Sequence, residues 1–123
     1  MSTAIVGNVT RDPKPSATKT SLKPLARTSF GVIVKRTRIN PRSGKPDEST
    51  SKIEVHCRGP LADNVIASVR KGDRVIVKGH MEEFTWTNQH GAESSRLMLM
   101  AAEVGLSLLF AKIYPPDDDE GAA

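Results

Sequence analysis

The chain has few aromatic residues, one cysteine and no long apolar run, and each shortage excludes a class of protein. Aromatic side chains make up 4% of its 123 residues, so aliphatic side chains must fill the core of the single domain that this length allows. Cys57 stands alone, which excludes a disulfide within the chain and fits a reducing compartment. No apolar run approaches the roughly 18 residues of a membrane helix, and the opening MSTAIVGN lacks the regions of a signal peptide. We therefore expect a cytoplasmic protein without a membrane partner.

Charge is abundant and unevenly distributed. The chain has 18 Lys and Arg residues against 14 Asp and Glu residues, a net charge of +4. Four of the 14 acids are consecutive, at residues 117–120, so the rest of the chain carries 18 bases against ten acids. A basic body with an acidic end predicts a polyanionic partner and a disordered tail, whereas the alternative is a solvated surface without a target.

The first third of the chain shows the period of two that is typical of β-strands. TAIVGNVTRDP predicts a strand that ends at the Asp-Pro pair, and Gly7 within it indicates a bulge or a close backbone approach. In ARTSFGVIVKRTRI, the side chains of Phe30, Val32 and Val34 share one face. Both segments therefore predict strands.

A third strand follows a segment rich in turn residues. NPRSGKPDESTS predicts a long hairpin loop. KIEVHCR then alternates, with Ile53, Val55 and Cys57 on one face and polar, mostly basic side chains on the other. This pattern predicts a strand with one buried and one exposed face.

One segment predicts a helix. In GPLADNVIASVRKG, Pro60 suits the first helical position, and Leu61, Val65 and Val69 recur at intervals of four. Gly72 suits the position just after the last helical turn.

Two more strands follow the helix. DRVIVKGHM predicts a strand with Val75 and Val77 inward, and EEFTWTNQHGAES predicts the arm and turn of a hairpin. SRLMLMAAEVG returns as a strand whose apolar run, residues 97–100, leaves no wet face, so this strand is either central or covered by another subunit. LSLLFAKIYPP fits either a short helix or a further strand that clamps a neighbouring protomer.

The predicted order is three strands, one helix and two strands. Five short strands with a helix between the third and fourth are the arrangement of the oligonucleotide-binding (OB) fold, a small Greek-key barrel. The pattern therefore predicts a mainly β protein, with an OB-fold barrel over residues 1–113 and a short acidic tail over residues 114–123.

Several segments resemble bacterial single-stranded DNA-binding proteins. IVGNVTRDP is similar to the first strand of that family, LADNVIASVRKGDRVIVKGH to its helix and fourth strand, TWTNQHG to its tryptophan hairpin, and SSRLMLMAAEVGLSL to its last strand. VHCRG and ESSRLMLMAAEVG resemble the smaller second paralogue of actinobacteria more than the main replicative form. The resemblance implies an OB-fold barrel, a homotetramer, and binding of single strands without sequence preference or catalysis.

The lone tryptophan, Trp86, stands between two threonines beside a turn sequence, which is typical of a rim rather than a core. Proteins that bind single strands stack exposed bases on aromatic rings, at roughly 1–3 kcal/mol per base. The resemblance puts Trp86 at the tryptophan position of the family, and Phe84 shares its face of the strand. We expect both rings to stack on bases, although Trp86 could instead cover the edge of the core or a subunit interface.

Basic residues gather in one strand-loop-strand unit and on the strand after the helix, where they would form a groove for the DNA backbone. The candidate contacts are Lys35, Arg36, Arg38, Arg42, Lys45, Lys52, His56, Arg58, Arg74 and Lys78. The resemblance places Arg38, Lys52 and Arg58 where the family has aromatic platforms. We therefore expect this chain to hold DNA more by charge than its relatives do. A solvated hairpin without a target is the alternative.

No pattern in the sequence predicts catalysis, a metal or a cofactor. His56, His80 and His90 are not spaced as metal ligands, and His56 and Cys57 point to opposite faces of one strand. No catalytic triad and no glycine-rich phosphate loop can be identified in the sequence. We therefore expect a binding protein, not an enzyme, in which Cys57 is a small core residue.

The C-terminal end departs from the family pattern. Relatives often end in acids followed by a proline and an aromatic tip that docks repair and replication enzymes, whereas PPDDDEGAA has no apolar tip. We therefore expect recruitment through this end to be weak or absent. The expected partners are single-stranded DNA and other copies of the chain, in a homotetramer associated with the nucleoid.

We interpret the chain as a barrel that coats and protects single-stranded DNA during replication, recombination or repair. Two other functions stay open. The barrel could be a protein-interaction subunit of a DNA-processing complex, with Trp86 buried in an interface, or it could bind RNA.

Overall fold

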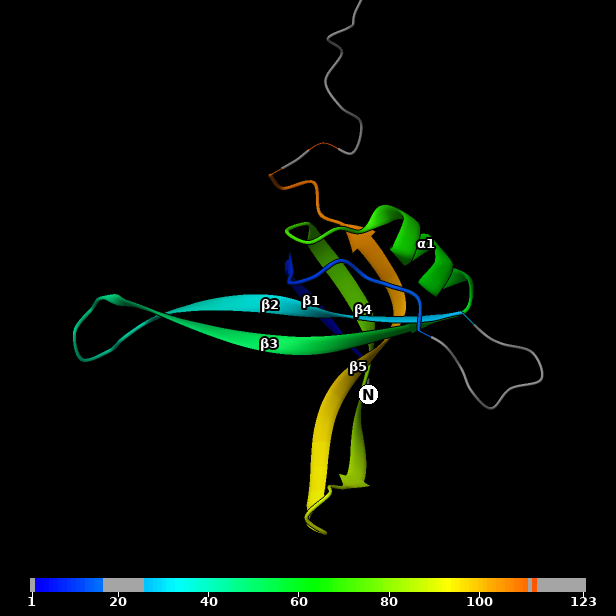
Figure 1. Cartoon of the computed structure of the whole chain (residues 1–123). Helices are drawn as coiled ribbons and strands as arrows, with labels where there is room; N and C mark the ends of the chain where they lie inside the picture. Colours follow the sequence, from blue (N-terminus) through cyan, green and yellow to red (C-terminus); the bar gives the residue numbers. More distant parts are fainter. Residues whose placement is uncertain (1, 17–25, 111, 113–123) are drawn as a thin grey trace, which may run out of the picture.

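The computed structural model describes residues 2–16, 26–110 and 112. The elements follow in the order β1 (Ser2–Val9), β2 (Arg27–Ile39), β3 (Pro46–Arg58), α1 (Pro60–Ser68), β4 (Arg74–Thr87) and β5 (Glu93–Leu106). The strands close into a barrel in the order β1-β2-β3-β5-β4 (Figure 1). Neighbouring strands are antiparallel except β3 and β5, which run parallel. The predicted fold class, a mainly β OB-fold barrel with its helix between the third and fourth strands, is confirmed.

Alternate residues of the strands fill the barrel, as the period of two predicts. Phe30 of β2 and Val55 of β3 are register partners, and both are fully buried. Val75 and Val77 of β4 are also fully buried. Burying each side chain of this size stabilises the fold by about 1.5–3 kcal/mol. The low aromatic content is therefore sufficient for one core.

Gly7 lies at a close approach between backbones, one of the two options that the sequence predicted. A Cβ atom built on Gly7 would lie 2.2 Å from the carbonyl oxygen of Ile33 in β2. No side chain fits at that distance. Glycine therefore lets β1 pair with β4 along most of its length and with β2 at its end.

Helix α1 packs against β2, β3 and β5 and buries Ala62 and Val65. Pro60 lies in its first turn, as predicted. The helix ends earlier than the position of Gly72 suggested. Val69 already has an extended backbone, with φ −103° and ψ 137°, and is buried.

The glycine prediction at this helix end is therefore wrong. Because the chain turns away to bury Val69, the last carbonyls are satisfied by a side chain instead: Arg70 Nη1 donates to the carbonyl oxygens of Ile66 and Val69, each at 2.9 Å. Gly72 adopts φ 93° in the turn that leads into β4.

Two hairpins project from the barrel in different directions (Figure 1). We name them the β2–β3 arm, residues 35–50, and the β4–β5 arm, residues 81–97. The predicted long loop in the first arm is wrong. The turn spans only residues 40–45, and residues 46–51 belong to β3 in continuous register with β2. Asn40 closes the turn, because its backbone N–H donates to the carbonyl of Lys45 and its Oδ1 accepts from the N–H of Arg42.

The chain leaves the barrel after β5 without forming a further element. Residues 107–110 are neither helix nor strand, so both options predicted for this segment are wrong over these residues. Leu108, Leu109 and Phe110 are exposed there. The predicted acidic tail, residues 114–123, lies outside the described residues. Among the residues that the structure describes, no helix has the length and apolar character to cross a membrane.

Candidate nucleic-acid interface

The outer face of β3, β5 and β4 brings together the exposed rings of Phe84 and Trp86 and part of the basic set. The register places His56 beside Met100 and Met98 beside Glu82. Phe84 pairs with Arg96 in the same hairpin. By strand alternation, all these side chains leave the sheet on the side away from the core.

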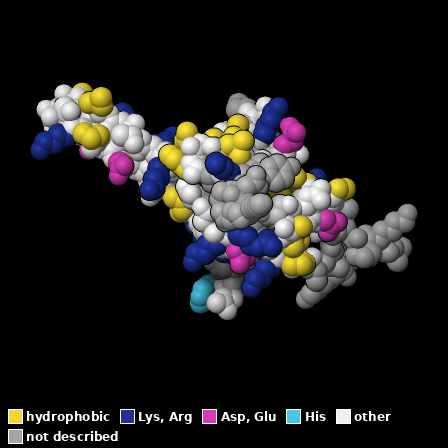
Figure 2. All heavy atoms as spheres, turned by 90° about the horizontal axis from the view of Figure 1, so that it is seen from above, with side chains coloured by type: hydrophobic (Ala, Val, Ile, Leu, Met, Phe, Trp, Pro, Cys, Tyr) yellow, Lys and Arg dark blue, Asp and Glu magenta, His cyan; other side chains and the backbone are white. Residues whose placement is uncertain are grey.

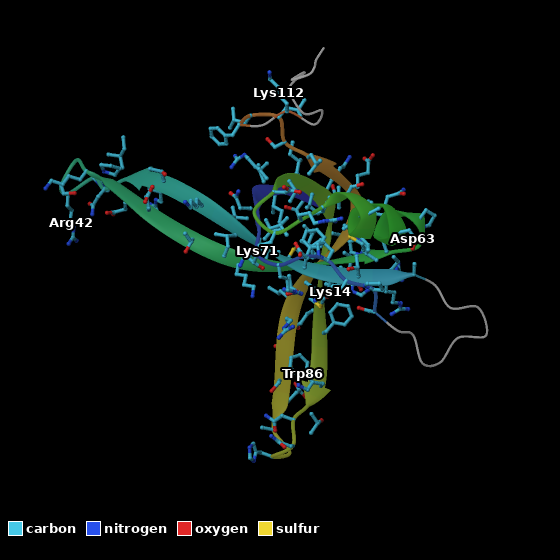
Figure 3. The ribbon with its side chains drawn as sticks, turned by 45° about the horizontal axis from the view of Figure 1, so that its top comes forward. Lys14, Arg42, Asp63, Lys71, Trp86 and Lys112 are labelled. Carbon is cyan, nitrogen blue, oxygen red and sulfur yellow. The ribbon has the colours of Figure 1, made fainter. Side chains whose placement is uncertain are left out.

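Phe84 and Trp86 are exposed on this face of the β4–β5 arm. The exposed fractions are 41% for Phe84 and 46% for Trp86, although both are large apolar side chains. Trp86 lies on the arm, away from the barrel body (Figure 3). The expected position of Trp86 at a rim rather than in the core is confirmed. Both rings can therefore meet a ligand.

A pocket of about 290 Å³ opens beside Phe84. Its lining residues are Arg27, His56, Arg58, Glu82, Phe84, Met98 and Met100. Arg27 and Arg58 are register partners on β2 and β3, so the two guanidinium groups leave the same face. The pocket combines a ring and two thioethers, which can contact a base, with two cations, which can contact phosphate.

His56 lies within this cationic pocket. Burial, together with the charges of Arg27 and Arg58, lowers the pKa of His56 below its ordinary value. The imidazole is therefore neutral at neutral pH. The two arginines supply the positive charge of the pocket.

The basic candidates of the β2–β3 arm are divided between its two faces. Lys35 and Lys52 follow the outer face of the barrel, whereas Arg36 and Arg38 leave the opposite face, with Ser49 and Asp47 as partners. Arg42 and Lys45 are exposed in the turn. Figure 2 shows Lys and Arg side chains spread along this arm. The arm is therefore basic on both faces, and Arg38 does not share a face with Lys52 and Arg58.

The last two candidates lie on the earlier part of β4. Lys78 leaves the outer face between Ala4 of β1 and Glu103 of β5. Arg74 begins β4, and the strand geometry separates it from Trp86 by about 40 Å.

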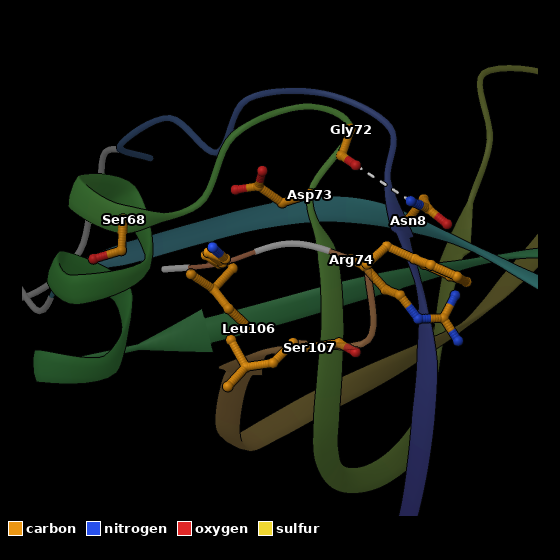
Figure 4. Close-up of a pocket in the computed structure, with 10 residues that line it drawn as sticks. Asn8, Ser68, Gly72, Asp73, Arg74, Leu106 and Ser107 are labelled. Atoms are coloured by element: carbon orange, nitrogen blue, oxygen red, sulfur yellow. Dashed lines mark hydrogen bonds between the residues drawn. The ribbon is translucent and has the colours of Figure 1, made fainter. Parts of the chain in front are cut away.

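Arg74 has a different neighbour. Its guanidinium carbon lies 5.4 Å from the centre of the Phe110 ring. It lines a separate pocket of about 360 Å³ with Asn8 and Gly72, in which the side chain of Asn8 donates to the carbonyl of Gly72 (Figure 4). The structure therefore does not bring Arg74 together with the aromatic rings.

Two arginines of the candidate interface were not predicted from the sequence. Arg27 was identifiable, because it begins a strand in which Thr28 and Phe30 point inward and Arg27 and Ser29 point outward. Arg96 was not, because only the hairpin register shows that it stands opposite Phe84.

Cys57 and the histidines form no reactive group among residues 2–16, 26–110 and 112. Cys57 is fully buried, and burial raises the pKa of its thiol to about 12. The thiol is therefore protonated and unreactive. Within the described part of the chain, no three His, Cys, Asp or Glu side chains gather as metal ligands would.

Known proteins are similar to this chain in sequence. The family model for the single-strand binding protein family matches residues 1–107. A single-stranded DNA-binding protein of Corynebacterium glutamicum is 33% identical over 116 residues, which cover 88% of this chain and 47% of that protein. A protein of the same description from Helicobacter hepaticus is 29% identical over 101 residues, which cover 79% of this chain and 55% of that protein. The chain spans about half the length of these curated relatives.

A solved structure shows the same fold at low identity. The Plasmodium falciparum SSB complex with ssDNA matches with a TM-score of 0.77, covering 86% of this chain and 93% of that one, at 14% sequence identity.

Proposed function

The chain belongs to the single-strand binding protein family, and from this premise we propose that it binds and protects single-stranded DNA without sequence preference. One observation carries the proposal. Phe84 and Trp86 expose their rings on the face that also holds the pocket with Arg27 and Arg58. Rings beside cations are what an unpaired strand requires, because it presents both free bases and phosphates.

The two kinds of contact act on different parts of the strand. Each base that stacks on Phe84 or Trp86 contributes roughly 1–3 kcal/mol, and any base can do so because every base has a π-face. The basic side chains hold phosphates, and each neutralised phosphate adds about −0.7 to the slope of log affinity against log salt. Sequence tolerance follows from both, since neither contact reads the edge of a base.

The β2–β3 arm supplies most of the charge in this proposal. Because Lys and Arg side chains project from both faces of the arm, it can contact phosphates on either side as a DNA strand passes it. We expect a salt slope steeper than about −2, the contribution of roughly three phosphates.

The biological role that follows is coating of single strands during replication, recombination or repair, by a binding protein rather than an enzyme. A cytoplasmic, nucleoid-associated location is part of the proposal, and a lone buried cysteine fits a reducing compartment.

A homotetramer is the assembly that we propose. Val6 of β1 and Ile76 of β4 are register partners on the outer face, where they are 37% and 45% exposed. A pair of exposed aliphatic side chains on a sheet is the kind of surface that a second subunit covers. Sedimentation equilibrium of the wild type should give four times the chain mass, and Val6→Lys/Ile76→Lys should give a smaller species. A wild-type monomer would contradict the assembly.

The proposed function is tested by direct binding. Fluorescence anisotropy of a labelled single strand of mixed sequence should rise and saturate with added protein, and the same strand in a duplex should bind far more weakly. The labelled strand should remain intact after incubation. Equal or stronger binding of RNA would favour an RNA-binding barrel, and no binding would favour a protein-interaction subunit.

A further inference from the structure

A second basic pocket, of about 430 Å³, opens between the segment after β1 and the turn after α1. Three basic side chains line it, those of Arg11, Lys14 and Lys71. Among the described residues that line it, the one acid is Asp12, whose Oδ1 already accepts the backbone N–H of Lys71 at 2.7 Å. The side chains of Lys14 and Lys71 lie on the barrel body, whereas Trp86 lies on the arm (Figure 3). The pocket therefore has an excess of positive charge and lies apart from the aromatic rings.

Gly31 connects this pocket to the candidate interface. A Cβ atom built on Gly31 would lie 2.7 Å from Cε of Lys52 and 3.3 Å from Nη1 of Arg11. The side chains of Lys52 and Arg11 therefore converge over the bare backbone of Gly31. Lys52 is on the face that carries His56 and Arg58, and the one acid between Lys52 and His56 on this face is Glu54, the register partner of Gly31.

The two pockets also adjoin along β2. Arg27 lines the pocket beside Phe84, and Ser29 lines the second pocket. These residues leave the same face of β2, about 7 Å apart by strand geometry. A flexible strand can therefore pass from one pocket to the next without leaving the sheet.

Glu54 lies where the path crosses β3, and Arg11 neutralises it. Arg11 forms an ion pair with Glu54, and its Nη1 lies 3.4 Å from the second carboxylate oxygen. The Glu54 side chain is only 15% exposed, whereas that of Arg11 is 44% exposed. The carboxylate is thus covered, and the guanidinium keeps donors that face solvent. A phosphate approaching this point meets Arg11 before it meets Glu54.

We propose that Arg11, Lys14 and Lys71 form a second phosphate-binding subsite for the same DNA strand. The path runs from Trp86, past the pocket at Phe84 and over Gly31, to the second pocket. The ligand is a phosphodiester of single-stranded DNA. The subsite rests on the proposed function and extends it, because it lengthens the strand that one protomer holds.

Strand length is the variable that tests the subsite. Oligothymidines from about 4 to about 16 nucleotides, the range that one OB fold occupies, are titrated while Trp86 fluorescence reports whether the rings are engaged. Lys14→Gln removes one charge from the second pocket. Arg11→Gln/Glu54→Gln removes the guanidinium without leaving Glu54 unpaired. Lys112→Gln removes one charge outside the path and is the matched control.

The shortest strands should bind all variants as they bind the wild type, because they fill only the aromatic end. With the longest strands, Lys14→Gln and Arg11→Gln/Glu54→Gln should each lose about 0.7 from the salt slope, and Lys112→Gln should lose nothing. Slopes that equal the wild type at every length would overturn the subsite. So would a loss that is the same at the shortest and longest lengths.

The failure of the subsite is distinct from the failure of the proposed function. If long strands quench Trp86 and bind Lys14→Gln unchanged, only the subsite is wrong. If the wild type binds no single strand, both are wrong. A site for free phosphate would show saturable binding of inorganic phosphate without dependence on strand length, and that result would also overturn the subsite.

Discussion

The two arms of this barrel have the same backbone structure but carry different kinds of side chain. Each is an antiparallel hairpin that leaves the barrel with most of its side chains exposed. The β2–β3 arm has no aromatic residue and five bases against two acids, Asp47 and Glu48. The β4–β5 arm has Phe84 and Trp86, with one Lys or Arg residue, Arg96, against three acids.

The proposed function therefore assigns stacking and charge to separate hairpins. A net acidic arm does not attract phosphate, so its contribution to binding must come from its rings. A basic arm without rings contributes charge alone. Because salt weakens charge contacts far more than stacking, the two contributions can be measured separately.

The largest expected effect is on stability, and it should distinguish the ring of Phe30 in the core from the ring of Phe84 on the arm. Phe30→Ala should lower the free energy of unfolding by about 3–5 kcal/mol, because Phe30 is fully buried. Phe84→Ala should change stability little and weaken DNA binding instead, because Phe84 is 41% exposed. Urea unfolding followed by circular dichroism measures the first effect and strand titration the second. A large loss of stability in Phe84→Ala would place that ring in the fold rather than in the interface.

Replacing the tryptophan should weaken binding without changing its salt dependence. Trp86→Ala should cost about 1–3 kcal/mol of DNA affinity, the value of one stacked base. Titrations at several salt concentrations should give parallel lines for the variant and the wild type. Leu97→Ala is the control, because Leu97 is 59% exposed on the opposite face of the same arm. Equal losses in both variants would remove the special role of the ring.

Neutralising the basic arm should have the opposite effect, because it should change the salt dependence of binding and leave the stacking on Trp86 unchanged. Arg36→Gln/Arg38→Gln should reduce the salt slope by about 1.4, for two phosphates, while a saturating strand still quenches Trp86 fully. Arg36→Lys/Arg38→Lys keeps the charge and should keep the slope. If the glutamine variant also lost the quenching, the arms would act as one unit rather than as two.

The smallest expected effect concerns the pocket beside Phe84, at the base of the β4–β5 arm. Because the folded state lowers the pKa of His56, the unfolded chain binds more protons there as the pH falls below about 6.5. The free energy of unfolding should therefore decrease as the pH is lowered through this window. The destabilisation due to His56 should reach its full value once the pH is below the pKa of His56 in the folded state. His56→Gln should show a shallower decrease between pH 7.5 and pH 5.5 in urea unfolding. The same decrease in variant and wild type would contradict the assigned cause.

The elements that have one buried face were predictable from the sequence. Apolar residues recur at every second position in all three strands, as Phe30 and Val32 do in β2, and that period indicates β2, β3 and β4. The period disappears where both faces meet water. Residues 46–51 have the composition of a loop, yet they form a strand because the partner residues of β2 extend to meet them.

The site was predictable where one strand carries it and not where several strands meet. Trp86 and Phe84 are two residues apart on one strand, so their shared face was readable. Arg11 and Glu54 are 43 positions apart in the sequence, and only the closed barrel brings them together. The division of the basic arm into two faces likewise required the register of β2 against β3.

The most direct test is a titration with oligothymidine that follows Trp86 fluorescence at several salt concentrations, beside a duplex of equal length. We predict quenching that saturates, a slope of log affinity against log salt steeper than about −2, and little binding of the duplex. Binding that leaves Trp86 unquenched, or a slope shallower than −2, would contradict the account of rings on one arm and charge on the other.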